Sequence, residues 1–168
     1  MQNQSIIVCG ADELDNFSKA THIIRIVNPK VGASKPVWFK GDFLQLSFGD
    51  VVSDADAHAY NTLPPTVDDI YQALDFSRKA WAVSNSTLLV SCDYGASRSP
   101  ALAYVIWADK MGPGRELEAF THIINIRPEA VPNILVVSLG DMVLKRNNSL
   151  TKPLSEFNQS IMEALGLL

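Results

Sequence analysis

The chain has 168 residues, of which 47% are hydrophobic and 19% are charged, so it can bury a domain-sized core and is not intrinsically disordered. Its formal net charge of −4 argues against a general nucleic-acid binder, which presents a basic face to phosphates. Its two cysteines cannot build a disulfide framework, and no apolar run approaches the roughly 20 residues that span a bilayer. The amino-terminal residues lack the basic start and apolar stretch of a signal peptide. We therefore expect one cytoplasmic domain over residues 1–168, with no nucleic-acid or membrane partner.

The first part of the chain alternates short apolar runs with turn signals. Residues 5–10 are rich in β-branched side chains and close with a glycine, which predicts a buried strand. Residues 11–20 have an acidic first turn and apolar side chains three positions apart, which predict a short helix. A second strand is predicted over residues 22–27, a loop over 31–36, and one or two strands over 37–48.

The middle of the chain contains the most irregular segment. Residues 50–65 are acidic, carry small side chains and end in a proline pair, which predicts a long surface loop of the kind that often carries function. Thr66 is the predicted N-cap of a helix that residues 84–86 interrupt. Residues 87–90 then predict a central strand that is buried on both faces.

The last part of the chain is mainly helical. Helices are predicted over residues 100–111, 116–126 and 132–144, and residues 151–168 form a carboxy-terminal tail or helix. Strands first, helices later, and βα alternation between them predict an α/β domain. We expect a central, mostly parallel sheet of about four to five strands flanked by helices.

The segment that carries chemistry lies between the strand at 87–90 and the helix that follows it. Cys92 and Arg98 stand at the two ends of a loop of mostly small residues that leads directly into a helix. Backbone N–H groups in such a loop form an anion-binding nest, and the helix N-terminus adds positive potential. The same N–H groups would stabilise a thiolate at Cys92, over which a phosphate monoester would sit. Arg98 would grip two phosphate oxygens through its planar fork while the thiolate attacked phosphorus in line.

Residues 88–99, LLVSCDYGASRS, resemble the signature of the cysteine-dependent protein tyrosine and dual-specificity phosphatases. Cys92, Gly95, Arg98 and Ser99 are in register with it. The resemblance extends over most of residues 40–145, and it is specific in the signature and looser elsewhere. A Val-Pro-Asn run at 131–133 followed by Asp141 is similar to a bacterial dual-specificity-like subgroup. The resemblance implies a phosphotyrosine-phosphatase-like fold.

The resemblance also implies roles at individual positions. Cys92 would be the nucleophile, Arg98 would bind the phosphate and stabilise the transition state, and Ser99 would help the thiolate leave. No metal and no organic cofactor is implied. The backbone amides that would cradle the phosphate belong to Asp93, Tyr94, Gly95, Ala96, Ser97 and Arg98.

Family members take a proton for the leaving group from an aspartate on an upstream loop. We expect Asp50 to be that acid, because it follows a strand and opens the long loop. It stands farther upstream of the cysteine than usual, so residues 51–63 would be an insertion. Asp54 and Asp56 are rivals on the same loop.

Three further positions, Ser91, Cys9 and Asn133, bear on whether the loop acts as it does in the family. The family generally has a histidine before the nucleophile, where this chain has Ser91, which would hydrogen-bond within the loop. Cys9 is expected to pack in the core, and Asn133 to make a structural contact near the loop. Arsenate reduction is disfavoured because Cys9 is the only other thiol, and sulfur transfer is disfavoured because such domains usually lack the Arg-Ser pair that ends this loop.

The sequence thus predicts a phosphomonoester hydrolase. Its substrate would be a phosphoprotein, chiefly a phosphotyrosine protein with phosphoserine or phosphothreonine in addition, or a small phosphomonoester. The alternative is a catalytically weak or inactive phosphate-binding module.

Overall fold

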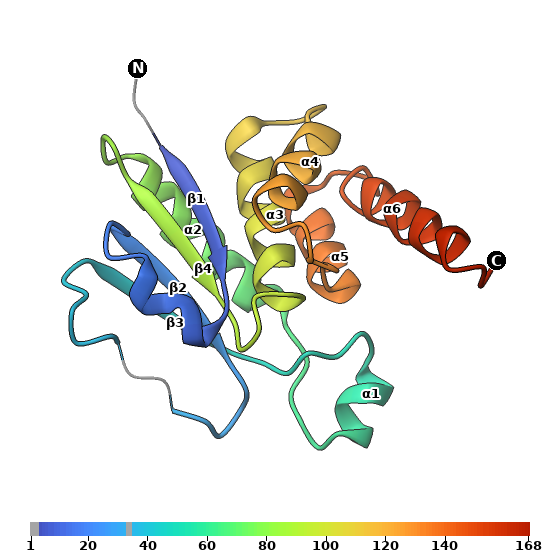
Figure 1. Cartoon of the computed structure of the whole chain (residues 1–168), viewed down its shortest axis with the longest axis horizontal. Helices are drawn as coiled ribbons and strands as arrows, with labels where there is room; N and C mark the ends of the chain where they lie inside the picture. Colours follow the sequence, from blue (N-terminus) through green and yellow to red (C-terminus); the bar gives the residue numbers. More distant parts are fainter. Residues whose placement is uncertain (1–3, 33–34) are drawn as a thin grey trace.

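The computed structural model describes residues 4–32 and 35–168, and its centre is one four-stranded sheet (Figure 1). The strands are β1 (Ser5–Cys9), β2 (His22–Val27), β3 (Asp42–Ser47) and β4 (Thr87–Ser91). They lie in the order β1-β4-β2-β3, and every pairing is parallel. The carboxyl ends of the strands therefore meet at one edge of the sheet, the lower edge in Figure 1. The predicted α/β fold with a largely parallel sheet is confirmed.

Helices cover the two faces of the sheet unequally. One face carries the main core, in which strand side chains such as Ile24 and Val90 pack with Leu102 and Tyr104, all fully buried. A smaller apolar cluster around Ile23 lies on the other face, where it packs with Leu14 of the 3-10 helix Ala11–Asn16 and with Trp38 and Phe39 of the β2–β3 connection. The helices of the main core are α2 (Val67–Trp81), α3 (Arg98–Met111), α4 (Glu116–Ile126), α5 (Ile134–Leu144) and α6 (Thr151–Ala164).

Capping residues explain where several helices begin. The Thr66 hydroxyl accepts a hydrogen bond from the Asp69 N–H at 3.2 Å, and the Asp69 carboxylate accepts one from the Thr66 N–H at 2.8 Å. This reciprocal pair starts α2 as predicted. The helix predicted from residue 132 begins two residues later, because the Asn133 side chain caps it by accepting from the Val136 N–H at 3.1 Å.

Two sequence predictions need correction. The helix expected over residues 11–20 is only a 3-10 helix, Ala11–Asn16. The segment expected to be loop over residues 50–65 contains a short helix, α1 (Asp54–Ala59), which the Ser53 hydroxyl caps. Of the predicted loop at 31–36, positions 33 and 34 lie outside the described residues, as do residues 1–3. Within the described ranges, no helix has both the length and the apolar character needed to cross a membrane.

Candidate active site

The segment that carries the predicted chemistry leaves the carboxyl end of β4, between β1 and β2, and runs directly into α3. Cys92 follows the strand and is only 3% exposed, whereas Tyr94 projects from the loop and is 83% exposed. Arg98 opens α3 and is again only 3% exposed. The loop therefore buries Cys92 and Arg98 at its two ends and presents Tyr94 to solvent.

The carbonyl groups of residues 93–97 are all held by surrounding parts of the fold. The donors come from the start of the 3-10 helix, from Arg127 at the end of α4, and from the segment before α5. The bonds are Ala11 N–H to Asp93 (2.9 Å), Arg127 to Tyr94 (3.1 Å) and Gly95 (3.2 Å), Val131 N–H to Ala96 (2.8 Å), and Asn133 N–H to Ser97 (3.1 Å).

This anchoring fixes the direction of the N–H groups. In a planar trans peptide the C=O of one residue and the N–H of the next point in opposite directions. Carbonyls that bond outward at 93–97 therefore turn the N–H groups of 94–98 inward. In the described part of the chain these N–H groups have no hydrogen-bond partner, and the Ser97 side chain does not cap α3. The result is a nest of free donors at a helix N-terminus, suited to an anion.

Gly95 lets the loop lie close to the neighbouring strand end. Its φ is +69°, and a Cβ atom there would lie 2.6 Å from the Cys9 carbonyl carbon and from the Gly10 nitrogen. A side chain at this position would meet backbone that cannot move aside. The glycine of the predicted signature is thus required by both conformation and space.

Cys92 and Ser99 face each other across the start of α3. The Cys92 Sγ lies 3.1 Å from the Ser99 Oγ, and Ser99 is fully buried. Either atom can donate in this contact, so the serine hydroxyl is placed to donate to a thiolate.

Arg98 is held in one orientation by three acceptors. Its Nη1 donates to Asn28 Oδ1 at 2.9 Å and to the Phe48 carbonyl at 3.0 Å, and its Nη2 donates to Asp93 Oδ2 at 2.8 Å. A guanidinium has five N–H groups, so the Nε–H and one Nη2–H are left over. The Arg98 Nε is buried and has no hydrogen-bond partner among the described residues. A buried orphan donor on an arginine is the expected state of a group that binds an anion.

Asp50 lies beside the loop, unlike the rival aspartates. Its Oδ1 accepts from the Ser97 hydroxyl at 2.7 Å and from the Asn133 side-chain amide at 2.8 Å. The same amide donates to the Val51 carbonyl at 3.1 Å. Asn133 thus ties the start of the long loop to the loop at 93–97, in keeping with the structural contact expected of it. In the described ranges, the side chains of Asp54 and Asp56 make no hydrogen bond to this loop.

Three residues at the site were not identified from the sequence. Arg25 on β2, Asn28 just after β2, and Arg127 after α4 all contact the loop side chains or carbonyls. Arg25 gave one available signal, since it is the only charged residue in an otherwise apolar strand apart from the terminal histidine. In the sequence, Asn28 indicates only a turn after a strand, and Arg127 only the end of a helix.

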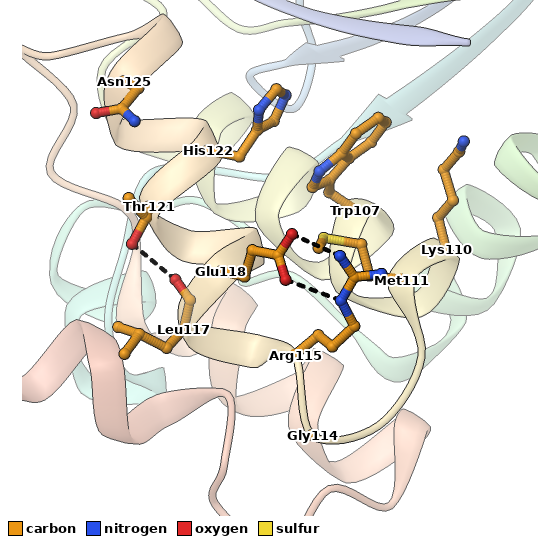
Figure 2. A pocket seen from close by; sticks show the side chains of 10 residues that line it. All are labelled: Trp107, Lys110, Met111, Gly114, Arg115, Leu117, Glu118, Thr121, His122 and Asn125. Carbon is orange, nitrogen blue, oxygen red and sulfur yellow. Dashed lines mark hydrogen bonds and ion pairs between the residues drawn. The ribbon is translucent and has the colours of Figure 1, made fainter. Parts of the chain in front are cut away.

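A larger groove lies elsewhere and lacks this chemistry. It is a groove of about 880 Å³ between α3 and α4, shown in Figure 2. Its side chains are largely engaged with one another: Trp107 stacks on His122 at 4.7 Å, and Arg115 forms an ion pair with Glu118. The residues that line it are Trp107, Lys110, Met111, Gly114, Arg115, Leu117, Glu118, Thr121, His122 and Asn125. Among the described residues, no three His, Cys, Asp or Glu side chains gather as metal ligands.

Comparisons with known proteins agree with this geometry at the level of the fold. No protein-family model and no curated protein matches the chain. The solved structure of DUSP15 matches with a TM-score of 0.64 and 18% identity, over 93% of this chain and 92% of that one. Human DUSP28 matches with a TM-score of 0.61 and 17% identity, over 83% and 91% of the two chains. The structure of PTPMT1 in complex with PI(5)P matches with a TM-score of 0.59 and 14% identity, over 84% of this chain and 90% of that one. The chain has the fold of the dual-specificity and protein tyrosine phosphatases.

Proposed function

We propose that this chain is a phosphomonoester hydrolase that acts through a cysteinyl-phosphate intermediate. Its main substrates are phosphotyrosine proteins, and it also accepts phosphoserine or phosphothreonine. The observation that carries the proposal is the inward-facing set of free N–H groups at 94–98, on a loop that begins at the buried Cys92 and ends at Arg98, whose buried Nε has no hydrogen-bond partner among the described residues. Together these groups can bind three phosphate oxygens and leave the phosphorus facing a thiolate.

In the first step the Cys92 thiolate attacks phosphorus. The S–P bond forms and the bond from phosphorus to the leaving oxygen breaks, while Arg98 and the loop N–H groups stabilise the charge on the equatorial oxygens. The leaving oxygen takes a proton from Asp50, whose Oδ1 is held by Ser97 and Asn133. Its Oδ2 is the oxygen that carries this proton.

In the second step water attacks phosphorus, the P–S bond breaks, and inorganic phosphate and the thiolate are formed. Asp50 takes the proton of the water. The Ser99 hydroxyl, 3.1 Å from the Cys92 Sγ, donates a hydrogen bond to the departing thiolate. No electron transfer or cofactor enters this balance.

The space beside the loop favours a phosphoprotein over a polyphosphorylated lipid. A pocket of about 340 Å³ opens next to Asp50 and Asn28, which both touch the phosphate loop or its arginine. Among the described residues that line it, Asp50 is the only charged one, so a second phosphate would meet a carboxylate rather than a cation. The lining residues are Asn28, Pro29, Gly49, Asp50, Val51, Tyr60, Asn61 and Thr62.

The deciding experiment is hydrolysis of para-nitrophenyl phosphate and of a phosphotyrosine peptide from pH 5 to 8, with EDTA present. We expect wild-type turnover, none for Cys92→Ser, and a kcat for Asp50→Asn lower by about 10²–10⁴-fold on the peptide. The loss should be much smaller on para-nitrophenyl phosphate, whose leaving group needs little protonation. Asp54→Asn is the matched control and should keep wild-type kcat on both substrates.

The contrary outcome is equally specific. Wild-type protein that binds tungstate but shows no turnover on either substrate would contradict the enzyme proposal. It would instead favour the inactive phosphate-binding module, in which Arg98 keeps its affinity for the anion.

A further inference from the structure

Arg25 is a buried cation in the middle of the sheet. It lies on β2, between apolar neighbours, with 9% of its surface exposed. Its register partner on the adjacent strand is Ser91, the last residue of β4. A buried guanidinium is costly without hydrogen-bonded partners, so its contacts indicate what it is kept for.

Among the described residues, Arg25 hydrogen-bonds to the last residue of β4 and to the residue that follows the nucleophile. Its Nη1 donates to the Ser91 hydroxyl at 3.2 Å, and its Nη2 lies 3.4 Å from Asp93 Oδ1. Ser91 in turn donates to the Cys92 carbonyl at 3.3 Å. Arg25 therefore contacts the residues immediately before and after the nucleophile.

The Asp93 carboxylate contacts Arg98 as well as Arg25. One carboxylate oxygen, Oδ1, faces Arg25, and the other, Oδ2, accepts from Arg98 Nη2 at 2.8 Å and from the Asn28 side-chain amide at 2.8 Å. Asn28 also accepts from Arg98 Nη1 at 2.9 Å. A single carboxylate thus bridges two guanidinium groups, and the Arg98 Nε keeps no hydrogen-bond partner among the described residues.

The charges explain why two arginines are needed. Asp93 alone would align Arg98 but would cancel its charge next to the site that takes a phosphate dianion. With Arg25 on the other carboxylate oxygen, the group of three carries a net positive charge. Arg25 thereby lets a carboxylate orient the phosphate-binding arginine without neutralising it.

We propose that Arg25 is a positioning residue of the phosphate site: through Asp93 it fixes the orientation of Arg98, and through Ser91 it holds the start of the loop. The proposal rests on the proposed function, because the loss it predicts is a loss of turnover. It assigns Arg25 no contact with the substrate.

The test is a double-mutant cycle of Arg25→Gln, Asp93→Asn and the combined variant, read in kcat and KM on a phosphotyrosine peptide. A displaced catalytic group costs about 10²-fold in rate, and we expect each single variant to lose about that factor in kcat. Because both substitutions break the same Arg25–Asp93–Arg98 chain of contacts, the kcat of the combined variant should be no more than about tenfold below that of either single variant. Arg78→Gln is the matched control, since Arg78 is ion-paired with Asp109 on the surface, and it should keep wild-type kinetics.

Tungstate binding by calorimetry gives a readout that needs no turnover. We expect Arg25→Gln to weaken tungstate binding by about tenfold or more, because a cation near the anion is lost. A wild-type protein that binds tungstate without turnover would contradict the proposed function. The tungstate affinities of wild type and Arg25→Gln could still be compared, so the role of Arg25 would be tested separately. An Arg25→Gln variant with wild-type kcat and tungstate affinity, or losses in kcat that multiply in the cycle, would overturn the role of Arg25.

Should Arg25→Gln fail to fold, Arg25→Lys takes its place in the cycle. Lysine keeps the cation but cannot make both contacts through a planar fork. A kcat at least about tenfold below wild type, in a variant with a native circular dichroism spectrum, supports the positioning role. Wild-type kcat in that variant contradicts it.

Discussion

Strands β1 and β4 lie side by side, run in the same direction, and lead into the two cysteines of the chain, Cys9 and Cys92. Both thiols are buried, yet their surroundings differ in one respect. Cys9 packs in an apolar cluster, and burial raises its pKa to about 11. Cys92 opens a loop whose N–H groups at 94–98 have no hydrogen-bond partner in the described part of the chain, and its Sγ lies 3.1 Å from the Ser99 hydroxyl. At Cys9 burial outweighs a hydrogen bond with Ser91 and the nearby charges of Arg127 and Arg25, so one donor or cation near a buried thiol does not by itself make it reactive.

The most severe test of this comparison exchanges each thiol for a hydroxyl. Cys92→Ser should lower kcat on a phosphotyrosine peptide by about 10⁴-fold or more, because the nucleophile is lost. Cys9→Ser should change kcat by no more than about twofold in the folded protein and lower its free energy of unfolding by about 1–3 kcal/mol. Steady-state kinetics and urea titration measure the two quantities. Equal losses of kcat in the two variants would contradict the contrast.

Alkylation with iodoacetamide compares the two thiols without substrate. With a pKa of about 11, about one Cys9 side chain in a thousand is ionised at pH 8, so Cys9 should stay unlabelled there and begin to react as the pH rises toward 11. Cys92 should be labelled at pH 7, and tungstate should protect it. Peptide mass spectrometry reads each site, and labelling in urea, where both thiols are exposed, is the control. Rapid labelling of Cys9 at pH 7 in folded protein would show that its burial is not as described.

Gly95→Ala tests the contact between the two strand ends. Its Cβ would lie 2.6 Å from the backbone of Cys9 and Gly10 at a φ of +69°, so we expect a loss of about 1–3 kcal/mol in unfolding free energy and a lower kcat. Gly112→Ala is the control, because Gly112 also has a positive φ, +87°, but nothing lies within 4 Å of its Cβ position. Only the Gly95 variant should lose kcat. An equal stability loss with unchanged kcat in both would mean that the loop tolerates displacement from β1.

Sequence reasoning located the loop between β4 and α3 and most helices because their signals are local. The Thr66–Asp69 cap and the glycine in the loop each act within a few residues, and both were recognised. The short helix α1 was missed because six residues are too few for a periodic pattern, although its Ser53 cap was available as a signal. Arg25, Asn28 and Arg127 were missed because their roles follow from the strand order, which places β2 and the end of α4 beside the loop.

The tether of Asp50 has a consequence for how this molecule can diversify. Asn133 holds Asp50 and Val51 from α5, and the Gly49 N–H bonds the Leu63 carbonyl at 2.8 Å, so segment 52–62 leaves and returns at nearly the same point. Doubling the length of a flexible loop costs only about 0.6 kcal/mol in closure entropy. The segment can therefore be lengthened, shortened or exchanged while the carboxylate keeps its place. In the terms of protein engineering, segment 52–62 is a replaceable cassette beside the Asp50 carboxylate, which Asn133 holds in place.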